Sequence, residues 1–405
     1  MSKSSLNRRD FLKVGLSGLV ATGTSTLFLA ADQKRAKDEK GKSVATTAEP
    51  QPPGGRREGY IYRTLGKTGV VLPVVSMGVM NSDNPELVRA ALDSGLIHLD
   101  TAHSYQRGRN EEIIGQVLKG RPRDSFFIAT KVKEDEKFMD LVDLSLKRLG
   151  LDYVDILYLH NLSKRDNVLA EQNLKVMEQV KKSGKARFIG VSTHANEPEV
   201  IRAALEAKIY DVVLSGYNFR KDYIKDLDAA IAQATAAGVG IIAMKTMAGA
   251  FWDKLRTKPI NTRAALKWAL NNPNITTAIP GMTTFEQLKS NLEVVKDLKL
   301  TPEELHDLKL GEAENLAGLY CQGCERCVPQ CPKGLPIPEM MRAYMYAYGY
   351  KNLAAAHELV SSLNLPDNPC AGCSSCSVSC AFKFDVRDRI VDINRLKSVP
   401  SEFFA

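Results

Sequence analysis

All eight cysteines of this 405-residue chain lie in its last quarter, in two runs of identical spacing. Each run has the form Cys-x₂-Cys-x₂-Cys-x₃-Cys, and a proline follows the first run but not the second. The runs consist of Cys321, Cys324, Cys327 and Cys331, and of Cys370, Cys373, Cys376 and Cys380. Such short, repeated spacings favour several sulfurs converging on a common centre, because they suit pairwise bridges less well.

Three other chemistries compete for these cysteines. Four disulfides would suit an exported protein, Cys-x₂-Cys pairs are common zinc ligands, and free thiols are the third alternative. The complete spacing resembles the cysteine run of bacterial ferredoxins, including the terminal proline of the first run. That resemblance implies two [4Fe–4S] clusters. It also implies shared ligation, with Cys321, Cys324, Cys327 and Cys380 around one cluster and Cys370, Cys373, Cys376 and Cys331 around the second.

Between residues 60 and 300, short β-branched runs alternate with amphipathic helical stretches. Strands are predicted at 74–77, 96–100, 126–130, 153–159, 187–191, 212–215, 240–243 and 276–279. This alternation indicates an α/β fold of the (β/α)₈ or TIM-barrel type. An open doubly wound sheet would fit the periodicity nearly as well, but no G-x-G-x-x-G sequence follows the first strand. Ahead of that strand, residues 63–69 predict a hairpin at the bottom of the barrel.

Polar side chains stand at the ends of three consecutive predicted strands. Asp100 and Tyr105 follow the second strand, Lys131 follows the third and His160 ends the fourth. Catalytic residues of such barrels lie at the carboxyl ends of the strands. An ammonium beside a phenol lowers the pKa of the phenol, a carboxylate holds the ammonium, and an imidazole can orient a carbonyl oxygen. Each residue alone is more often a helix cap, a core residue or a surface charge, but their joint placement predicts a proton donor.

The sequence around these residues resembles the aldo/keto reductase family. The matching stretches are Asp-Thr-Ala-His-Ser-Tyr at 100–105, Ala-Thr-Lys-Val at 129–132 and Tyr-Leu-His-Asn at 158–161. The resemblance covers about residues 60–300 and implies NAD(P)H-dependent carbonyl chemistry. It implies Tyr105 as general acid, tuned by Lys131 and Asp100, with His160 orienting the substrate. It also implies cofactor contacts from Ser192, Met244, Gly281, Gln287 and Asn291.

Four positions depart from the pattern of that family. Leu214 stands where many members have a carboxamide-binding glutamine, and Met244 stands where many have an aromatic side chain against the nicotinamide. Gly281 and Gln287 stand where NADPH-preferring members often place Lys and Arg, so a 2′-phosphate lacks its obvious partners. The sequence therefore does not support a preference for NADPH over NADH. A barrel that keeps the fold but binds no nucleotide is the alternative.

The first 59 residues are predicted to lie outside the fold. Arg8-Arg9 followed by Phe-Leu-Lys and a mildly apolar stretch at 14–31 resembles a twin-arginine export signal, with Asn7 where Ser or Thr is usual. We expect a signal peptide at 1–31, a flexible linker at 32–59 and a periplasmic destination. An uncleaved leader would tether the protein to a membrane. Of the net charge of +8, +5 lies in these 59 residues, so a basic nucleic-acid-binding face is not expected.

Residues 301–405 are predicted to form a small, mainly helical ferredoxin-like domain. Thr301 followed by Pro302 predicts a capped helix start, and 337–347 and 353–363 have a helical pattern. Together these features predict an exported iron–sulfur oxidoreductase of the aldo/keto reductase type. It would reduce a small carbonyl compound or oxidise an alcohol, exchanging electrons through two clusters with an unidentified redox partner. The alternative is a non-catalytic barrel that serves as a docking or sensory module for an electron-transfer domain.

Overall fold

The computed structural model describes residues 50–404. The predicted signal peptide and residues 32–49 of the predicted linker lie outside the described residues. The described end of that linker contacts the barrel, because the guanidinium of Arg57 donates a hydrogen bond to the backbone oxygen of Asp93 at 2.8 Å. Within the described part of the chain, no helix has the length and apolar character needed to cross a membrane.

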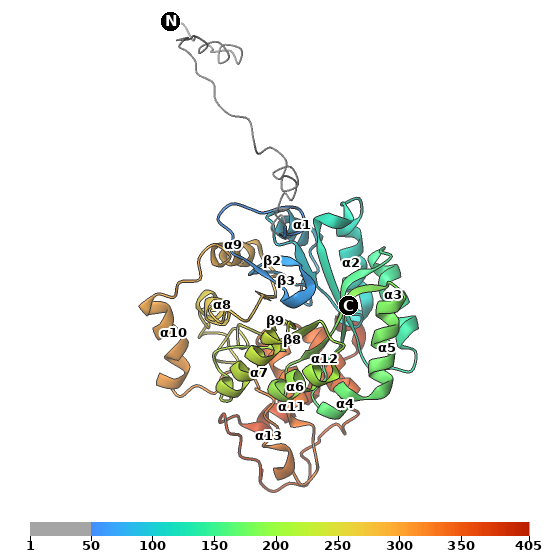
Figure 1. The fold of residues 1–405 in the computed structure, drawn as a ribbon. Helices are drawn as coiled ribbons and strands as arrows, with labels where there is room; N and C mark the ends of the chain where they lie inside the picture. The colour runs from blue at the N-terminus through green and yellow to red at the C-terminus, as the bar shows by residue number, and fades with distance from the viewer. Residues whose placement is uncertain (1–49, 405) are drawn as a thin grey trace, which may run out of the picture. The chain divides into compact units, whose positions relative to one another are not determined.

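Eight parallel strands form a closed barrel, with helices outside it (Figure 1). The strands are β3 (Met77–Gly78), β4 (His98–Asp100), β5 (Phe127–Val132), β6 (Val154–Leu159), β7 (Ala186–Thr193), β8 (Val212–Gly216), β9 (Gly240–Met244) and β10 (Thr277–Ala278). Each strand pairs with the next in chain order. Bridges from Val75 to Ala278 and from Gly78 to Gly281 join the first strand region to the last. The predicted (β/α)₈ barrel is therefore confirmed, and an open sheet is excluded because both edges are paired.

Helices connect the strands and cover the outside of the barrel (Figure 1). They are α1 (Pro85–Asp93), α2 (Arg109–Leu118), α3 (Phe138–Leu149), α4 (Arg165–Leu169), α5 (Glu171–Lys182), α6 (Glu197–Ala207), α7 (Ile224–Ala236), α8 (Thr262–Leu270) and α9 (Phe285–Val294). Short 3₁₀ turns are η2 (Tyr105–Gly108) and η3 (Arg123–Ser125). Local chemistry sets the helix ends. The side chain of Asn84 accepts backbone hydrogen bonds at the start of α1, and Gly150 ends α3 in the left-handed conformation.

Two apolar cores stabilise the barrel. One lies between the strands and the helices, where Ile114 is fully buried. The other fills the inside of the barrel and includes Leu214 and Tyr158. Space there is tight, because a Cβ atom at Gly190 would lie 2.2 Å from the backbone oxygen of Val212 and 2.9 Å from the ring of Tyr158. Glycine at this position therefore allows β7 to approach its neighbours.

A hairpin closes the amino-terminal end of the barrel, as predicted. β1 (Tyr62–Thr64) pairs antiparallel with β2 (Val71–Pro73), and η1 (Gly66–Thr68) forms the turn. Leu65 is fully buried in the core inside the barrel, and burying a side chain of this size contributes about 1.5–3 kcal/mol. The backbone amide of Lys67 donates a hydrogen bond to the oxygen of Gly238 at 2.7 Å, which fixes the hairpin beside β9.

The carboxyl-terminal segment is mainly helical and packs on the barrel, with α11 and α13 below β8 and β9 in the view of Figure 1. Its elements are α10 (Pro302–Ala313), η4 (Val328–Gln330), α11 (Ile337–Tyr348), α12 (Leu353–Ser362), α13 (Val386–Asn394), η5 (Arg395–Ser398) and η6 (Ser401–Phe404). Thr301 caps α10 and forms a capping box with Glu304. Trp252 and Ile260 of the barrel loops share an apolar core with Met340 of α11. The predicted helices are therefore present, and this segment packs directly against the barrel loops.

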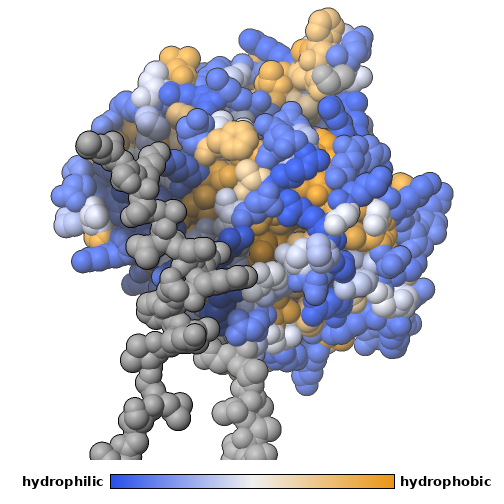
Figure 2. Space-filling model, turned by 90° about the horizontal axis from the view of Figure 1, so that it is seen from above, coloured by the Kyte–Doolittle hydropathy of each residue, from blue (hydrophilic) through white to orange (hydrophobic). Residues whose placement is uncertain are grey.

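The face seen in Figure 2 is mostly hydrophilic, with small separate hydrophobic patches. The most exposed large apolar side chains of the described residues are Leu255 and Phe403. Scattered apolar residues of this kind are normal on a folded protein.

Candidate active site and cysteine centres

The structure brings the four predicted strand-end residues together. Lys131 in β5 lies between Asp100, at the end of β4, and Tyr105, in the following turn. Its Nζ donates hydrogen bonds to Asp100 Oδ1 and to the backbone oxygen of Thr101, both at 2.5 Å, and to the phenol oxygen of Tyr105 at 3.4 Å. The ring of His160, after β6, meets the ring of Tyr105 edge-on, with centres 5.9 Å apart. The four side chains therefore form one cluster at the carboxyl end of the barrel.

A strained turn holds Tyr105 in this cluster. The next two residues, Gln106 and Arg107, have left-handed backbone angles, with φ of 51° and 55°. Such a conformation costs a residue other than glycine about 1–2 kcal/mol. The side chain of Gln106 donates a hydrogen bond to the backbone oxygen of Met80 at 3.2 Å, which ties the turn to the loop after β3. Backbone strain of this kind concentrates at functional sites, where the surrounding structure holds it.

Burial dominates the acid–base properties of the cluster. Burial raises the pKa of Asp100 and lowers the pKa of Lys131, while the attraction between the two groups opposes both shifts. The pKa of Tyr105 is raised well above its usual value by burial, and then by the charges of Asp100 and Tyr346. The expectation that Lys131 lowers this pKa is therefore wrong. The ammonium lies closer to Asp100 than to the phenol, so the carboxylate offsets its charge.

His160 is a neutral imidazole near neutral pH. Its pKa is held well below the usual value by burial and then by four cations, Lys131, Lys133, Arg342 and Lys245. Its buried Nδ1 has no hydrogen-bond partner among residues 50–404. A neutral imidazole with a ring nitrogen free to bond can orient a carbonyl oxygen, in the tautomer that presents an N–H group.

Two of the predicted cofactor contacts lie at strand ends. Ser192 is buried as the last residue but one of β7, and its Oγ accepts a hydrogen bond from the backbone amide of Asn161 at 2.9 Å. Met244 ends β9 and packs against the core inside the barrel. Leu214 is fully buried in that core, so it offers no hydrogen bond to a carboxamide. Of these three side chains, only Ser192 carries a polar group.

The other three predicted contacts follow β10. Gly281 forms the bridge with Gly78 that helps close the barrel, and Asn291 is buried on α9. Gln287 is exposed on α9, where its Oε1 accepts a hydrogen bond from the backbone amide of Thr283 at 2.6 Å. The side-chain amide of Gln287 is therefore already hydrogen-bonded within its own loop. Gly281 and Gln287 supply no cation for a phosphate.

Four further polar residues at this end of the barrel were missed by the sequence analysis. His194 and Lys245 follow β7 and β9, and Arg342 and Tyr346 belong to α11. His194, Lys245 and Arg342 line one crevice together with Cys321. The strand-end rule that found the first cluster would have found His194 and Lys245 as well. No local signal marks the α11 residues, because their role depends on how the helix docks.

The first cysteine centre combines residues of both runs. Cys321 and Cys327 each lie near enough to both Cys324 and Cys380 for the charges of these two cysteines to act on them. Burial raises the pKa of Cys321 to about 12. A hydrogen bond from the backbone amide of Gly323 opposes this rise, and the charges of the other three cysteines add to it. The structure therefore places the last cysteine of the second run with the first three of the first run.

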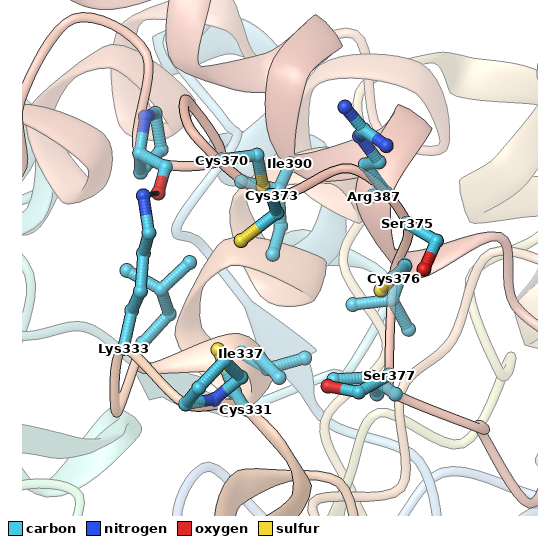
Figure 3. Close-up of a pocket in the computed structure, with 15 residues that line it drawn as sticks. Cys331, Lys333, Ile337, Cys370, Cys373, Ser375, Cys376, Ser377, Arg387 and Ile390 are labelled. Atoms are coloured by element: carbon cyan, nitrogen blue, oxygen red, sulfur yellow. Dashed lines mark hydrogen bonds between the residues drawn. The ribbon is translucent and has the colours of Figure 1, made fainter.

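The second centre contains the remaining four cysteines. Figure 3 shows Cys331, Cys370, Cys373 and Cys376 around a common hollow. Burial raises the pKa of Cys370, and the charges of the other three cysteines add to this rise while that of Arg387 opposes it. The last cysteine of the first run is thus placed with the first three of the second.

No disulfide bond joins any of the eight cysteines in the structure. Among residues 50–404, no group of three or more Cys, His, Asp or Glu side chains is arranged to hold a single metal ion. A zinc ion would draw its sulfur ligands in to about 2.3 Å, which requires sulfurs close to one another. The sulfurs in Figure 3 instead stand around an open space.

A buried ion pair attaches the first cysteine loop to the barrel. Lys221 and Glu197 are both fully buried, with Nζ and Oε1 2.6 Å apart. Lys221 also donates a hydrogen bond to the backbone oxygen of Gln322 at 3.2 Å, inside the first cysteine run. Next to it, Gly323 has φ of 69°, and a Cβ atom there would lie only 3.0 Å from the Cβ of Ala195. The loop therefore packs in one position against the end of β7.

Comparison with known proteins identifies the class of this barrel. The profile of the aldo/keto reductase family matches residues 76–265. These residues include the whole strand-end cluster, with Asp100, Tyr105, Lys131 and His160. The chain thus contains an aldo/keto reductase family domain, and the protein is an oxidoreductase.

Individual relatives agree with this class. L-glyceraldehyde 3-phosphate reductase of Escherichia coli O157:H7 is 26% identical over 329 residues, covering 64% of this chain and 94% of that protein. L-galactose dehydrogenase of Arabidopsis thaliana is 26% identical over 284 residues, covering 58% and 88%. A solved aldo-keto reductase from Bacillus halodurans has the same fold, with a TM-score of 0.52, 23% identity and coverage of 62% and 96%. Each relative matches over most of its own length and leaves more than a third of this chain unmatched.

Proposed function

We propose that this protein is an exported iron–sulfur oxidoreductase that reduces a small carbonyl compound, or oxidises the corresponding alcohol, at the end of the barrel. The observation that carries the proposal is the shared crevice. Cys321 of the first cysteine centre lines it together with His194 and Lys245 of the barrel. A redox group held by these cysteines would therefore border the barrel site.

Tyr105 is the proton donor of the proposed reaction. Its raised pKa keeps it protonated near neutral pH, and an alkoxide forming at the substrate is basic enough to take its proton. Lys131 donates a hydrogen bond to the phenol oxygen and holds the phenol in position. Neutral His160 orients the carbonyl oxygen beside Tyr105.

Each cysteine centre is proposed to hold one [4Fe–4S] cluster, the first through Cys321, Cys324, Cys327 and Cys380 and the second through Cys331, Cys370, Cys373 and Cys376. The doubled run and the grouping of four sulfurs at each centre support this assignment. When bound, such clusters supply one-electron transfer. Apolar Ile337 and Ile390 also line the second hollow, and an apolar shell of this kind tunes the potential of a cluster.

The hydride of the proposed reaction comes from a nicotinamide cofactor, NADH or NADPH, as the aldo/keto reductase domain suggests. Ser192 and Met244 would face its nicotinamide end, and Gly281, Gln287 and Asn291 would lie along the rest. No preference for NADPH is proposed. Gly281 has no side chain and Gln287 is bonded to Thr283, so neither position offers a cation to a 2′-phosphate.

Export by the twin-arginine route is part of the proposal, with the periplasm as destination. The leader that carries Arg8-Arg9 supports it, although that leader lies outside the described residues. Clusters are inserted in a reducing compartment, and an exporter of folded proteins would carry them across intact, whereas an unfolded thiol-rich chain would risk disulfides. A small substrate and a redox protein are the partners, and an uncleaved leader would add a membrane tether.

A non-catalytic barrel that docks an electron-transfer domain is the second candidate. The position of α11 favours it, because Arg342 of that helix lines the same crevice as His194 and Lys245, so the helix covers these two residues at the end of the barrel. The two candidates differ in turnover. The docking function predicts that no carbonyl compound is reduced and that Tyr105→Phe changes nothing.

Anaerobic redox assays test the proposed function. NADH or NADPH is added to the purified protein while visible absorbance and EPR spectra are recorded, and a panel of small aldehydes and ketones follows. The proposal predicts cluster reduction by a nucleotide and carbonyl turnover that Tyr105→Phe abolishes. Nucleotide-independent spectra together with no turnover for any carbonyl would favour the docking function.

A further inference from the structure

Three successive residues of the barrel bind the segment that carries the first cysteine run. They belong to the loop between β8 and α7. Arg220 donates a hydrogen bond to the backbone oxygen of Ala317 at 2.9 Å, and Lys221 donates one to the backbone oxygen of Gln322 at 3.2 Å. The backbone amide of Asp222 donates a hydrogen bond to the side chain of Gln322 at 2.9 Å. The barrel loop therefore contacts the cysteine segment at several successive points.

Asp222 also holds an arginine beside a cysteine sulfur. Its carboxylate pairs with the guanidinium of Arg326, and the Nε of Arg326 donates a hydrogen bond to Cys324 Sγ at 3.5 Å. The guanidinium lies 5.7 Å from the centre of the Phe382 ring. The backbone oxygen of Arg326 accepts a hydrogen bond from the side chain of Gln330 at 2.8 Å. These contacts fix the charged donor on the sulfur of Cys324.

Backbone amides also donate hydrogen bonds to sulfurs of the first centre. The amide of Phe382 donates to Cys380 Sγ at 3.4 Å, and the amide of Gly323 donates to Cys321. A charged donor makes a stronger hydrogen bond than a neutral one. Among these donors the guanidinium of Arg326 carries the positive charge, and it can be removed by a side-chain substitution, whereas a backbone amide cannot.

We propose that Arg326 raises the reduction potential of the cluster held by the first cysteine centre, and that the barrel helps to set this potential because Asp222 holds Arg326 against Cys324. This inference rests on the proposed [4Fe–4S] clusters. Reduction adds one electron, and therefore one negative charge, to the centre, while no bond to Arg326 forms or breaks. A cation that donates a hydrogen bond to a ligand sulfur stabilises the more negative form, and cluster potentials respond to charge and to such hydrogen bonds.

Solvent limits the size of this effect. The side chain of Arg326 is 54% exposed, so water screens part of its charge. At a fixed potential, Arg326→Met should lower the ratio of reduced to oxidised first cluster roughly tenfold, which is a shift of about 59 mV toward more negative potential for a one-electron couple. Arg326→Gln removes the charge but keeps a polar side chain, so it should shift the potential in the same direction by a smaller amount.

A redox titration of the anaerobically purified holoprotein, followed by EPR, tests the proposal. Dithionite supplies the electrons through mediator dyes, and Cys380→Ser identifies the signal of the first cluster. The matched control is Arg202→Met, which removes an exposed arginine that pairs with Asp226. Arg326→Met is expected to shift the potential of the first cluster alone, and Arg202→Met is expected to shift neither potential.

Iron analysis of each protein separates the possible failures. An iron-loaded Arg326→Met with the wild-type potentials overturns the proposal, and so does an equal shift of both clusters. If Arg326→Met does not retain its iron, Arg326→Gln decides in its place, and wild-type potentials in that variant overturn the proposal. A wild type without iron overturns the proposed clusters and this inference together, whereas a wild type with two clusters and an unchanged first potential in the variants overturns this inference alone.

Discussion

The substitution Glu197→Gln tests how firmly the first cysteine loop is held on the barrel. Glu197 and Lys221 are both fully buried and 2.6 Å apart, and Lys221 also binds the backbone oxygen of Gln322. Glutamine keeps the shape of glutamate but removes its charge. The ammonium of Lys221 is then left buried without its counter-charge, and breaking a buried pair in this way costs about 3–5 kcal/mol.

The cost converts to a change in melting temperature. An unfolding entropy of about 2.1 cal/mol/K per residue, over the roughly 350 residues of the folded unit, gives a fall of about 4–7 °C. The assay is thermal unfolding of the anaerobically purified protein, followed by circular dichroism. The matched control is Glu171→Gln, which breaks an exposed pair with Lys175 and is expected to shift the melting temperature by less than about 1 °C.

The double variant Glu197→Gln/Lys221→Met separates the effect of the unpaired Lys221 charge from the effect of changing the side-chain shape. It removes the stranded ammonium, so it should regain much of the stability lost in the single variant. Equal melting temperatures for Glu197→Gln and Glu171→Gln would refute the assignment of this pair as an anchor. A double variant no more stable than Glu197→Gln would refute the electrostatic cause.

Three further predictions concern the site, the backbone and the pH dependence. Tyr105→Phe should lower carbonyl turnover by about 10²–10⁴-fold while the circular dichroism spectrum stays unchanged, and equal turnover would show that another group donates the proton. Gly323→Ala should lower the melting temperature more than Gly334→Ala, because both have positive φ but only the first would meet a neighbouring side chain; the reverse order would contradict the packing of the cysteine loop. Burial, followed by the charge of Lys131, lowers the pKa of His98 to about 3. Between that value and about 6.5 the unfolded state binds the extra proton, so stability falls as pH falls, by about 2 kcal/mol at pH 5. The melting temperature of His98→Leu should therefore fall less than that of the wild type when the pH is lowered from 7 to 5. Equal falls in melting temperature would show that His98 is not the group responsible.

Local patterns were sufficient to predict the barrel. Strands buried on both faces have continuous β-branched runs, and all eight were found by that signal. The start of α10 followed from Thr301 and Pro302, because a cap and a first-turn proline act within a few residues. The cluster around Tyr105 and Lys131 also followed from the sequence, since parallel strands bring their carboxyl ends together.

Long-range packing accounts for what the sequence did not reveal. The pattern of 337–347 predicted a helix but not which of its faces meets the barrel, so Arg342 and Tyr346 went unnoticed. The pKa of Tyr105 was predicted in the wrong direction for a related reason. Proximity to Lys131 could be inferred from strand order, whereas the depth of burial and the short contact from Lys131 to Asp100 are properties of the folded site.

The two cysteine centres are proposed to hold iron–sulfur clusters beside an oxidoreductase barrel. Iron and acid-labile sulfide analysis of the anaerobically purified protein, with EPR of the reduced form, tests this proposal most directly. We expect about eight irons and eight sulfides per chain, with the EPR signals of two [4Fe–4S] clusters. We also expect Cys380→Ser to alter the cluster of the first run and Cys331→Ser to alter that of the second. Zinc or four disulfides in place of iron would show that these cysteines hold no iron–sulfur cluster.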